Sequence, residues 1–455
     1  MKSMPLLLSV ISLLLVSTVC GSSFESPIVP DTNALIAQTT AYTVMDTGQT
    51  NCYNNMQEIS FPSEEEAFYG QDAQYETRVM NYQDNDDGTV TDLNTGLMWQ
   101  KSVSEKVVFD DAVANAYTFN LAGYTDWRLP TIKELFSLID FNGKTGMSAA
   151  DSIPYINTDY FDFEYGDESN GERYIDAQWC SSTEYVSTTM EGDHTVFGVN
   201  FADGRIKGYG TEMPGGEEKK FFVRYVRENP QYGINEFTDN ADGTISDQAT
   251  GLMWSRNDSG DGMNWEEALL YAQRMNDENY LGYDDWRIPD AKELQSIVDY
   301  TKSPDTTDSA AIDHMFNCTP IIDEGGSKNY AFYWTSTTHL DGPDASGAVY
   351  IAFGEALGWM EVGGEYVLYD VHGAGAQRSD PKTGDASDYP HGFGPQGDVR
   401  RIDNFIRLVR GGTYQELTEK RTSDTIDLNT ILLVTVPVSL VSIGTISYYL
   451  KRKKE

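Results

Sequence analysis

A glycine-rich stretch late in the sequence, between Glu361 and Val399, concentrates side chains that could bind a ligand. Its candidates are His372, Arg378, Asp380, His391, Gln396 and Asp398. Imidazole, guanidinium, carboxylate and amide groups can hydrogen-bond a polar ligand, and imidazole and carboxylate can hold a metal ion. A loop of this length is uncommon unless it has a function. The stretch therefore predicts a ligand or metal site, with a compact structural Ω-loop as the alternative.

A second group of polar side chains surrounds the Asp-Gly pair at residues 242–243 and offers oxygen ligands of the kind that calcium prefers. The candidates are Asp239, Asn240, Asp242 and Asp247, and a near-identical earlier group consists of Asp84, Asn85, Asp87 and Asp92. An EF-type loop carries an acid five residues before its glycine, where this sequence has Gln83 and Thr238. Asp-Gly is also a strong signal for a hairpin turn. A calcium site and a plain turn are both open, and no other cofactor is expected.

The sequence offers little for catalysis. It has no Ser-His-Asp order, no zinc-ligand pattern and no phosphate-binding loop, so no catalytic residue is predicted. The cysteines after the first 21 residues are Cys52, Cys180 and Cys318, and an odd number allows at most one disulfide bond among them. An oxidative activity that uses Cys318, or the loop that holds His372 and His391, is kept as an alternative.

All these candidates lie in a sequence that occurs twice. Residues 84–99 return almost unchanged as residues 239–254. A period near 155 residues is the size of a domain, so the chain carries a tandem duplication rather than a solenoid of short repeats. We expect the first repeat to span residues 78–227 and the second to span residues 231–410.

The second repeat is the longer one. Phe201 and Phe353 are 152 positions apart, whereas Arg227 and Arg410 are 183 positions apart, so the second repeat holds 31 additional residues. These residues fall in the glycine-rich stretch that carries the histidines. The difference between the repeats therefore coincides with the best candidate for a functional site.

Each repeat contains patterns of both helices and strands, which predicts an α+β fold. Apolar residues at helical spacing predict helices over residues 109–121 and 265–275. Further helices should begin at Thr131 and Asp290, each of which has a glutamate three residues later that completes a capping box. Alternating residues predict strands, for example over residues 196–201.

Five residues are expected to serve the architecture, because their motifs recur in both repeats. They are Trp127, Arg128, Trp286, Arg287 and Trp334. The repeated Asp-Trp-Arg sequence suggests a buried aromatic side chain flanked by an ion pair. Trp334 is expected to match Trp179 of the first repeat, which would put Cys180 in the place of Thr335.

The ends of the sequence predict export and a membrane anchor. Residues 1–21 have the layout of a secretory signal peptide. Residues 428–450 contain no charge and are followed by a basic tail at residues 451–455, as expected for a transmembrane helix with a cytoplasmic tail. Residues 22–77 form a leader and lead-in segment, and residues 411–427 form a stalk. The bulk of this single-pass protein would lie outside the cytoplasmic membrane.

Acidic residues far outnumber basic ones, and the net charge is −39. A surface of this charge repels nucleic acid and other polyanions at long range. No nucleic-acid partner is therefore expected.

Taken together, the repeated motifs resemble the DUF1566 family, which is named after the Lcl C-terminal domain of a collagen-like adhesin. The resemblance covers both repeats and rests on the Asp-Gly-Thr…Gly-Leu-Met-Trp, Asp-Trp-Arg-(Leu/Ile)-Pro and Lys-Glu-Leu motifs. It implies two tandem domains akin to C-type lectins and formylglycine-generating enzymes and, for the adhesin member, binding of sulfated glycans. In this sequence the predicted transmembrane helix follows the two domains. The family's lead-in has a second cysteine where this sequence has Ser60, so Cys52 lacks its implied partner.

The sequence therefore predicts a membrane-anchored, cell-surface binding protein. Its ligand would be a glycan or another surface component, recognised through the second repeat. Two alternatives are kept: an enzyme of the formylglycine-generating type or of another oxidative kind, and a structural protein of the cell envelope.

Overall fold

A computed structural model of the protein describes residues 41–190, 192–213, 215–412, 415–417 and 420. The predicted signal peptide, membrane span and cytoplasmic tail lie outside these residues. Within them, no helix is both long and apolar enough to cross a membrane. The described residues give no support to the predicted C-terminal transmembrane helix, which lies outside them.

The described part of the chain is mostly β-sheet and only 14% helical, so the predicted α+β class is wrong. The helices are short: α1 (Phe109–Ala116), α2 (Ile132–Ser137), α3 (Trp265–Asp277), α4 (Ala291–Ser296) and α5 (Pro304–Thr307). The first was expected to continue to residue 121. It ends at Ala116 because the next backbone N–H groups bond three residues back, a tighter turn that closes a helix.

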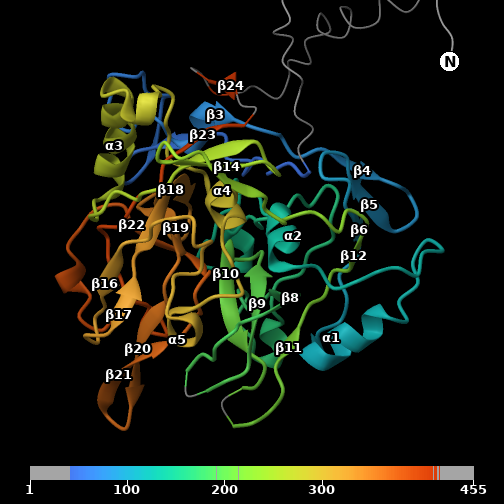
Figure 1. Ribbon diagram of the computed structural model, residues 1–455. Coiled ribbons are helices and arrows are strands. Elements are labelled where there is room, and N and C mark those ends of the chain that lie inside the picture. Colours follow the sequence, from blue (N-terminus) through green and yellow to red (C-terminus); the bar gives the residue numbers. More distant parts are fainter. Residues whose placement is uncertain (1–40, 191, 214, 413–414, 418–419, 421–455) are drawn as a thin grey trace, which may run out of the picture. The chain divides into compact units, whose positions relative to one another are not determined.

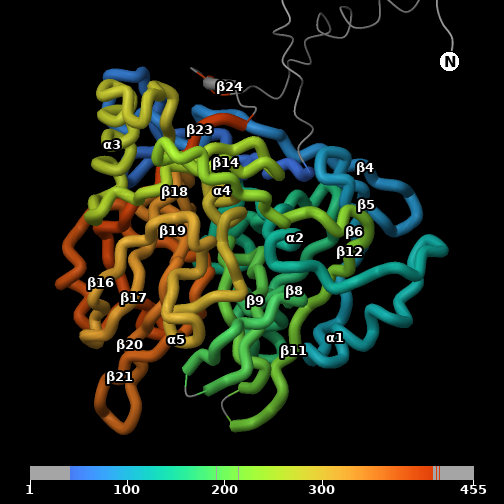
Figure 2. Tube along the Cα trace, in the orientation of Figure 1, coloured from blue at the N-terminus to red at the C-terminus, as the bar shows by residue number. Residues whose placement is uncertain are grey.

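A six-stranded antiparallel sheet forms the centre of the molecule and runs through both repeats (Figures 1 and 2). Its order is β18 (Phe332–His339), β19 (Gly347–Ala352), β22 (Gln377–Pro381), β10 (Arg205–Gly210), β9 (Thr195–Asn200) and β8 (Gln178–Glu184). The repeats join where β10 meets β22, with Ile206 opposite Gln377. One sheet therefore belongs to both repeats.

A four-stranded sheet accompanies each repeat. Its order is β12 (Val226–Arg227), β6 (Met98–Gln100), β5 (Thr89–Asp92), β4 (Tyr82–Asp84) in the first and β13 (Phe237–Asp239), β14 (Thr244–Asp247), β15 (Leu252–Ser255), β23 (Val409–Gly411) in the second. The hairpins β4–β5 and β13–β14 turn at the two Asp-Gly pairs, as the sequence predicted.

The described residues also contain five two-stranded ribbons. They pair β1 (Cys52–Tyr53) with β2 (Glu58–Ile59), β3 (Tyr75–Glu76) with β24 (Gln415–Glu416), β7 (Val107–Val108) with β11 (Lys220–Phe221), β16 (Pro320–Ile322) with β17 (Lys328–Tyr330), and β20 (Leu357–Val362) with β21 (Glu365–Asp370).

The helices α2 and α4 contact each other across the boundary between the repeats. Nζ of Lys133 donates to the carbonyl oxygen of Ser296 over 2.6 Å, and Nζ of Lys292 donates to that of Ser137 over 2.9 Å. The two bonds are reciprocal, because Lys133 and Ser137 occupy the positions in the first repeat that Lys292 and Ser296 occupy in the second. Burial lowers the pKa of each lysine to about 8.

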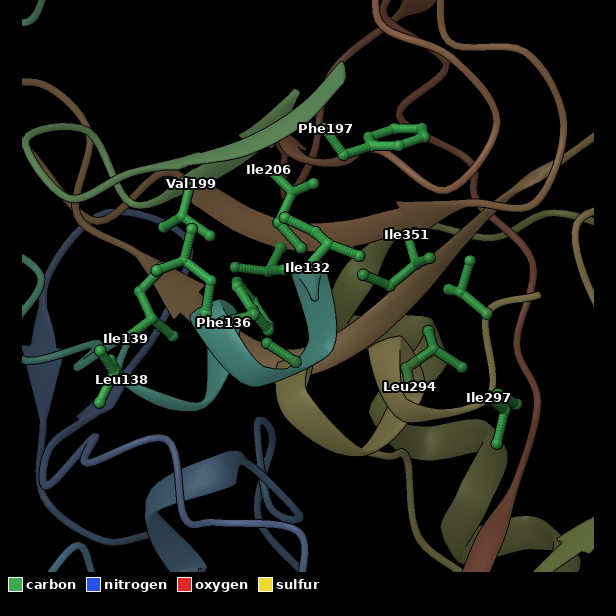
Figure 3. Close-up of a cluster of buried hydrophobic side chains, with 14 of the residues drawn as sticks. Ile132, Phe136, Leu138, Ile139, Phe197, Val199, Ile206, Leu294, Ile297 and Ile351 are labelled. Carbon is green, nitrogen blue, oxygen red and sulfur yellow. The ribbon is translucent and has the colours of Figure 1, made fainter. Parts of the chain in front are cut away.

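A hydrophobic core shared by both repeats lies between these helices and the central sheet (Figure 3). Its members include Ile132, Phe136, Leu138, Ile139, Phe197, Val199 and Ile206 of the first repeat and Leu294, Ile297 and Ile351 of the second. Each repeat also has a smaller core of its own, around Trp127 in the first and Trp286 in the second.

The predicted match of Trp334 with Trp179 is wrong by one residue. The backbone N–H of Cys180 donates to Phe222, and that of Trp334 donates to Phe405, the residue equivalent to Phe222. Trp334 therefore occupies the place of Cys180, not of Trp179. A shift of one residue moves a strand side chain to the opposite face. For this reason Trp179 packs into the shared core, while Trp334 packs into the core of the second repeat.

The Asp-Trp-Arg motifs fix the starts of α2 and α4. Trp127 and Trp286 are buried, but the flanking charges do not pair with each other. Arg128 instead binds both carboxylate oxygens of Glu134, and Arg287 binds both of Glu293. The same glutamates complete the capping boxes that the sequence predicted. The motif therefore links a helix cap to a buried ion pair.

We expect Glu293→Gln to lower the free energy of unfolding by about 3–5 kcal/mol, because it leaves the charge of Arg287 buried without its partner. The matched change Glu134→Gln should cost less, because the Arg128 side chain is 34% exposed and water can solvate it. Urea denaturation of both variants measures the difference. Equal losses in the two repeats would contradict this account.

Candidate ligand-binding site

The additional residues of the second repeat form a hairpin, a strand of the central sheet and a surface loop. After β19, β20 leaves the central sheet and pairs with β21. β22 then takes the place beside β19 that β10 takes beside β9 in the first repeat. Residues 382–399 follow as the surface loop. The stretch is thus partly interior structure and partly exposed surface.

Three of the predicted ligand-binding residues meet in the interior. Nε2 of His372 lies 2.8 Å from Oδ1 of Asp398, and Arg378 forms an ion pair with the other oxygen of that carboxylate. Burial lowers the pKa of His372 well below its usual value, so the imidazole is neutral and donates from Nε2. These contacts fasten the surface loop to β22. They position the exposed residues and do not themselves face solvent.

Asp380 also holds the chain in place. Its fully buried carboxylate accepts hydrogen bonds from the backbone N–H groups of Arg401 and Ile402, at 3.1 and 3.2 Å, and from the amide of Asn404 at 3.2 Å. Gln396 is half-buried, and its backbone approaches Gly358 so closely that a side chain at position 358 would collide with it. The surface loop therefore lies directly against β20.

Aromatic side chains, three of them exposed and two half-buried, lie on this loop and the hairpin. They are Trp359, Tyr366, Tyr389, His391 and Phe393, and we call them the aromatic platform. The rings of Tyr366 and His391 are stacked, with centroids 3.7 Å apart and planes inclined by 6°. Trp359 meets His391 edge-on at 6.2 Å, and Tyr389 meets Phe393 at 6.3 Å. Phe393 is 58% exposed and Tyr366 46%.

Of the predicted ligand-binding residues, only His391 is exposed on this platform. The sequence analysis missed the aromatic residues around it. Tyr366 stands 25 positions from His391, and only the return of the chain past β20 brings the two rings together. The available signal was the number of aromatic residues in a glycine-rich, polar stretch.

The four predicted calcium ligands are all engaged within the sheet of β13, β14 and β15. Oδ1 of Asp242 accepts from the backbone and the hydroxyl of Thr244, at 2.9 and 2.6 Å. Asp239 pairs with Arg256, Asn240 donates to two hydroxyls, and Asp247 accepts two backbone N–H groups. No cluster of three or more His, Cys, Asp or Glu side chains suited to a metal occurs in the described residues. Calcium binding stays a prediction.

Cys52, Cys180 and Cys318 are all free thiols. Burial raises the pKa of Cys52 and of Cys180 to about 12, and that of Cys318 to about 11. The thiolate is the reactive form of cysteine, and these groups are protonated at neutral pH. Among the described residues, Cys52 has no disulfide partner.

Two carboxyl groups lie at the base of the hairpin. Asp370 accepts hydrogen bonds from the hydroxyl of Tyr185 over 2.7 Å and from the backbone N–H of Gly373 over 2.8 Å, which connects the hairpin to the first repeat. Burial raises the pKa of Asp370 to about 6. Burial, and then the charge of Asp370, raises the pKa of Glu355 to about 8.

The fold and the site define a duplicated, β-rich protein with an aromatic binding surface on its second repeat. Its sequence matches the Lcl C-terminal domain over residues 88–227 and 243–368, which is more than half of the chain, and the protein belongs to this family. Family membership indicates a surface-associated or extracellular protein. The likeness to C-type lectins and formylglycine-generating enzymes stays an expectation.

Comparisons with curated proteins and with solved structures give no match. The second family match ends at residue 368, inside β21. His391 and Phe393, as well as β22, therefore lie beyond the part of the second repeat that the family match covers.

The raised pKa values of Glu355 and Asp370, at the base of the β20–β21 hairpin, should make the free energy of unfolding depend on pH. A carboxyl whose folded pKa is raised binds more protons when folded, so the free energy of unfolding falls as pH rises from about 4.5 toward 8. Glu355→Gln needs no proton and should lose less stability than the parent between pH 5 and pH 8. Urea denaturation across this range tests the prediction, with Glu365→Gln at the exposed hairpin turn as the control. Parallel curves for parent and Glu355→Gln would contradict it.

Proposed function

We propose that the protein is a binding protein of the cell exterior that recognises a glycan through the aromatic platform. The observation that carries the proposal is the exposed stack of Tyr366 and His391, with Trp359 edge-on to His391. Soluble proteins rarely leave neighbouring aromatic side chains in solvent unless they bind something there. The platform lies on the second repeat, where the sequence placed the binding site.

The chemistry of the platform suits a sugar. A pyranose ring has one face rich in C–H groups, which packs on an aromatic ring, and a rim of hydroxyls, which needs hydrogen-bond partners. His391 supplies a polar group within the platform, and Gln396 lies on the same loop. Because the net charge of the chain is −39, neutral glycans are favoured over sulfated or other anionic ones.

The platform is also prepared for binding before a ligand arrives. Asp398 is held by His372 and Arg378, and Asp380 holds the returning chain, so the loop is fixed on a buried base. A surface that is already ordered loses less entropy on binding than a mobile loop does. The buried residues that the sequence predicted to bind the ligand therefore hold the platform in place.

A glycan array probed with the purified full-length protein, in buffer with calcium, tests the proposal. We expect Tyr366→Ala and His391→Ala to weaken binding to any glycan that is found by at least about tenfold, which corresponds to about 1.4 kcal/mol. Tyr117→Ala is the matched control, because Tyr117 is 83% exposed but lies on the first repeat. Thermal denaturation should show all three variants folded.

Two results would count against glycan recognition at the platform. One is an array without any bound glycan. The other is binding that the control variant weakens as much as the two platform variants do.

A further inference from the structure

The lead-in segment packs on the second repeat, although the first repeat follows it directly in the sequence. Nζ of Lys292 donates to the backbone carbonyl of Asp46 over 2.8 Å. The hydroxyl of Thr47 donates to the carboxylate of Asp72 over 2.9 Å, and that of Thr337 donates to the same carboxylate. Residues 46–49 and 71–75 thus fill a groove beside α4 and β18, which we call the filled groove.

The first repeat contains the counterpart of this groove, and there the end near Arg128 and Thr183 is open. The other end is occupied, because Nζ of Lys133 donates to the carbonyl of Gly233 over 3.1 Å, as Nζ of Lys292 does to that of Asp46. A cavity of about 580 Å³ lies beside α2, and Arg128, Lys133 and Thr183 are among its lining residues. These residues match Arg287, Lys292 and Thr337 of the filled groove. The match is structural: the first N–H of α2 donates to the hydroxyl of Thr183, and the first N–H of α4 donates to that of Thr337, both over 3.0 Å.

The two grooves differ in what covers them. In the filled groove the ring of Tyr75 lies 5.7 Å from the guanidinium of Arg287, whose side chain is only 3% exposed. In the open groove the side chain of Arg128 is 34% exposed. Thr337 donates its hydroxyl hydrogen to the lead-in, whereas the hydroxyl of Thr183 lines the cavity.

The opposite walls correspond as well. In the filled groove the backbone N–H of Phe141 donates to the carbonyl of Thr47 over 2.8 Å. The residue that matches Phe141 is Tyr300, and it lines the open groove together with the exposed side chain of Ile234. The cavity is within the size range of natural ligand sites. The lead-in, bound in the filled groove, therefore shows that an extended polypeptide segment fits a groove of this kind.

We propose that the open groove binds an extended segment of another protein that resembles the lead-in. Such a segment would offer an oxygen acceptor, such as an aspartate, to the hydroxyl of Thr183 and an aromatic ring to the guanidinium of Arg128. The lead-in of a second molecule is disfavoured as the occupant, because each lead-in is tethered to its own filled groove at high effective concentration. This site is separate from the aromatic platform.

A labelled peptide with the sequence of residues 42–77 is the probe, titrated against the full-length protein by fluorescence anisotropy. We expect saturable binding that Ile234→Lys weakens at least tenfold, because a charged side chain then stands in the wall of the open groove. Ile322→Lys is the matched control, since Ile322 is 72% exposed, Ile234 is 55% exposed, and only Ile234 lines the cavity. A peptide with Tyr75→Ala should bind more weakly than the parent peptide.

Three outcomes would overturn the proposal: no saturable binding to the parent protein, equal binding by the parent and the Ile234→Lys variant, or loss of binding in the Ile322→Lys control alone. A fourth outcome would also overturn it: the peptide fails to bind, and Ile234→Lys abolishes the binding of a glycan. The open groove would then be a sugar-binding site. Tyr366→Ala should leave peptide binding unchanged, so this test and the test of the platform can fail separately.

Discussion

The pairing of β10 with β22 is the constraint on which the rest of the molecule depends. An unpaired edge strand exposes backbone groups to unwanted partners, and this pairing covers the free edges of both halves of the central sheet. The backbone N–H of Gly208 donates to the carbonyl of His372 over 2.8 Å, and a side chain at position 208 would collide with that oxygen. Because β22 occupies the third position in the second half of the sheet, β20 is displaced outward. The hairpin and its aromatic platform follow from that displacement.

The same duplication produced two grooves, one filled by the lead-in and one open at its Arg128 end. The reciprocal bonds of Lys133 and Lys292 hold α2 and α4 together. The groove beside each helix therefore lies next to the other repeat. A single lead-in can fill only one of the two grooves. It fills the groove of the second repeat, where the Arg287 side chain is consequently buried, and leaves the Arg128 side chain 34% exposed. Asymmetry in a duplicated protein thus arises from one segment that occurs once.

Local features of this fold could be predicted from the sequence, because they depend on neighbouring residues. The capping boxes at Thr131 and Asp290 and the Asp-Gly hairpins are of this kind. The balance of helix and sheet was misjudged, since apolar spacing does not reveal where α1 stops. The sheet that joins the repeats could not be inferred, because strand pairing over long sequence distances leaves no local pattern.

The candidate site was predictable only in part. Polar residues in the glycine-rich stretch drew attention to the right segment, but composition cannot distinguish a buried hydrogen-bonding residue such as Asp398 from an exposed one such as His391. The packing of the lead-in on the second repeat was equally invisible, since Asp72 and Thr337 are 265 residues apart. The alignment of Trp179 with Trp334 was wrong for a simpler reason. It matched two identical residue types and did not consider that successive residues of a strand face opposite sides of the sheet.

The shared sheet also affects how the protein is made. Ile206 and its partner Gln377 are separated by 171 residues, and chains grow by about 5–20 residues per second, so on the order of 10–30 s pass between the synthesis of the two strands. During that interval the first repeat has an open sheet edge at β10 and no second half of the shared core. We therefore expect the newly made first repeat to be prone to aggregation until the second repeat is complete.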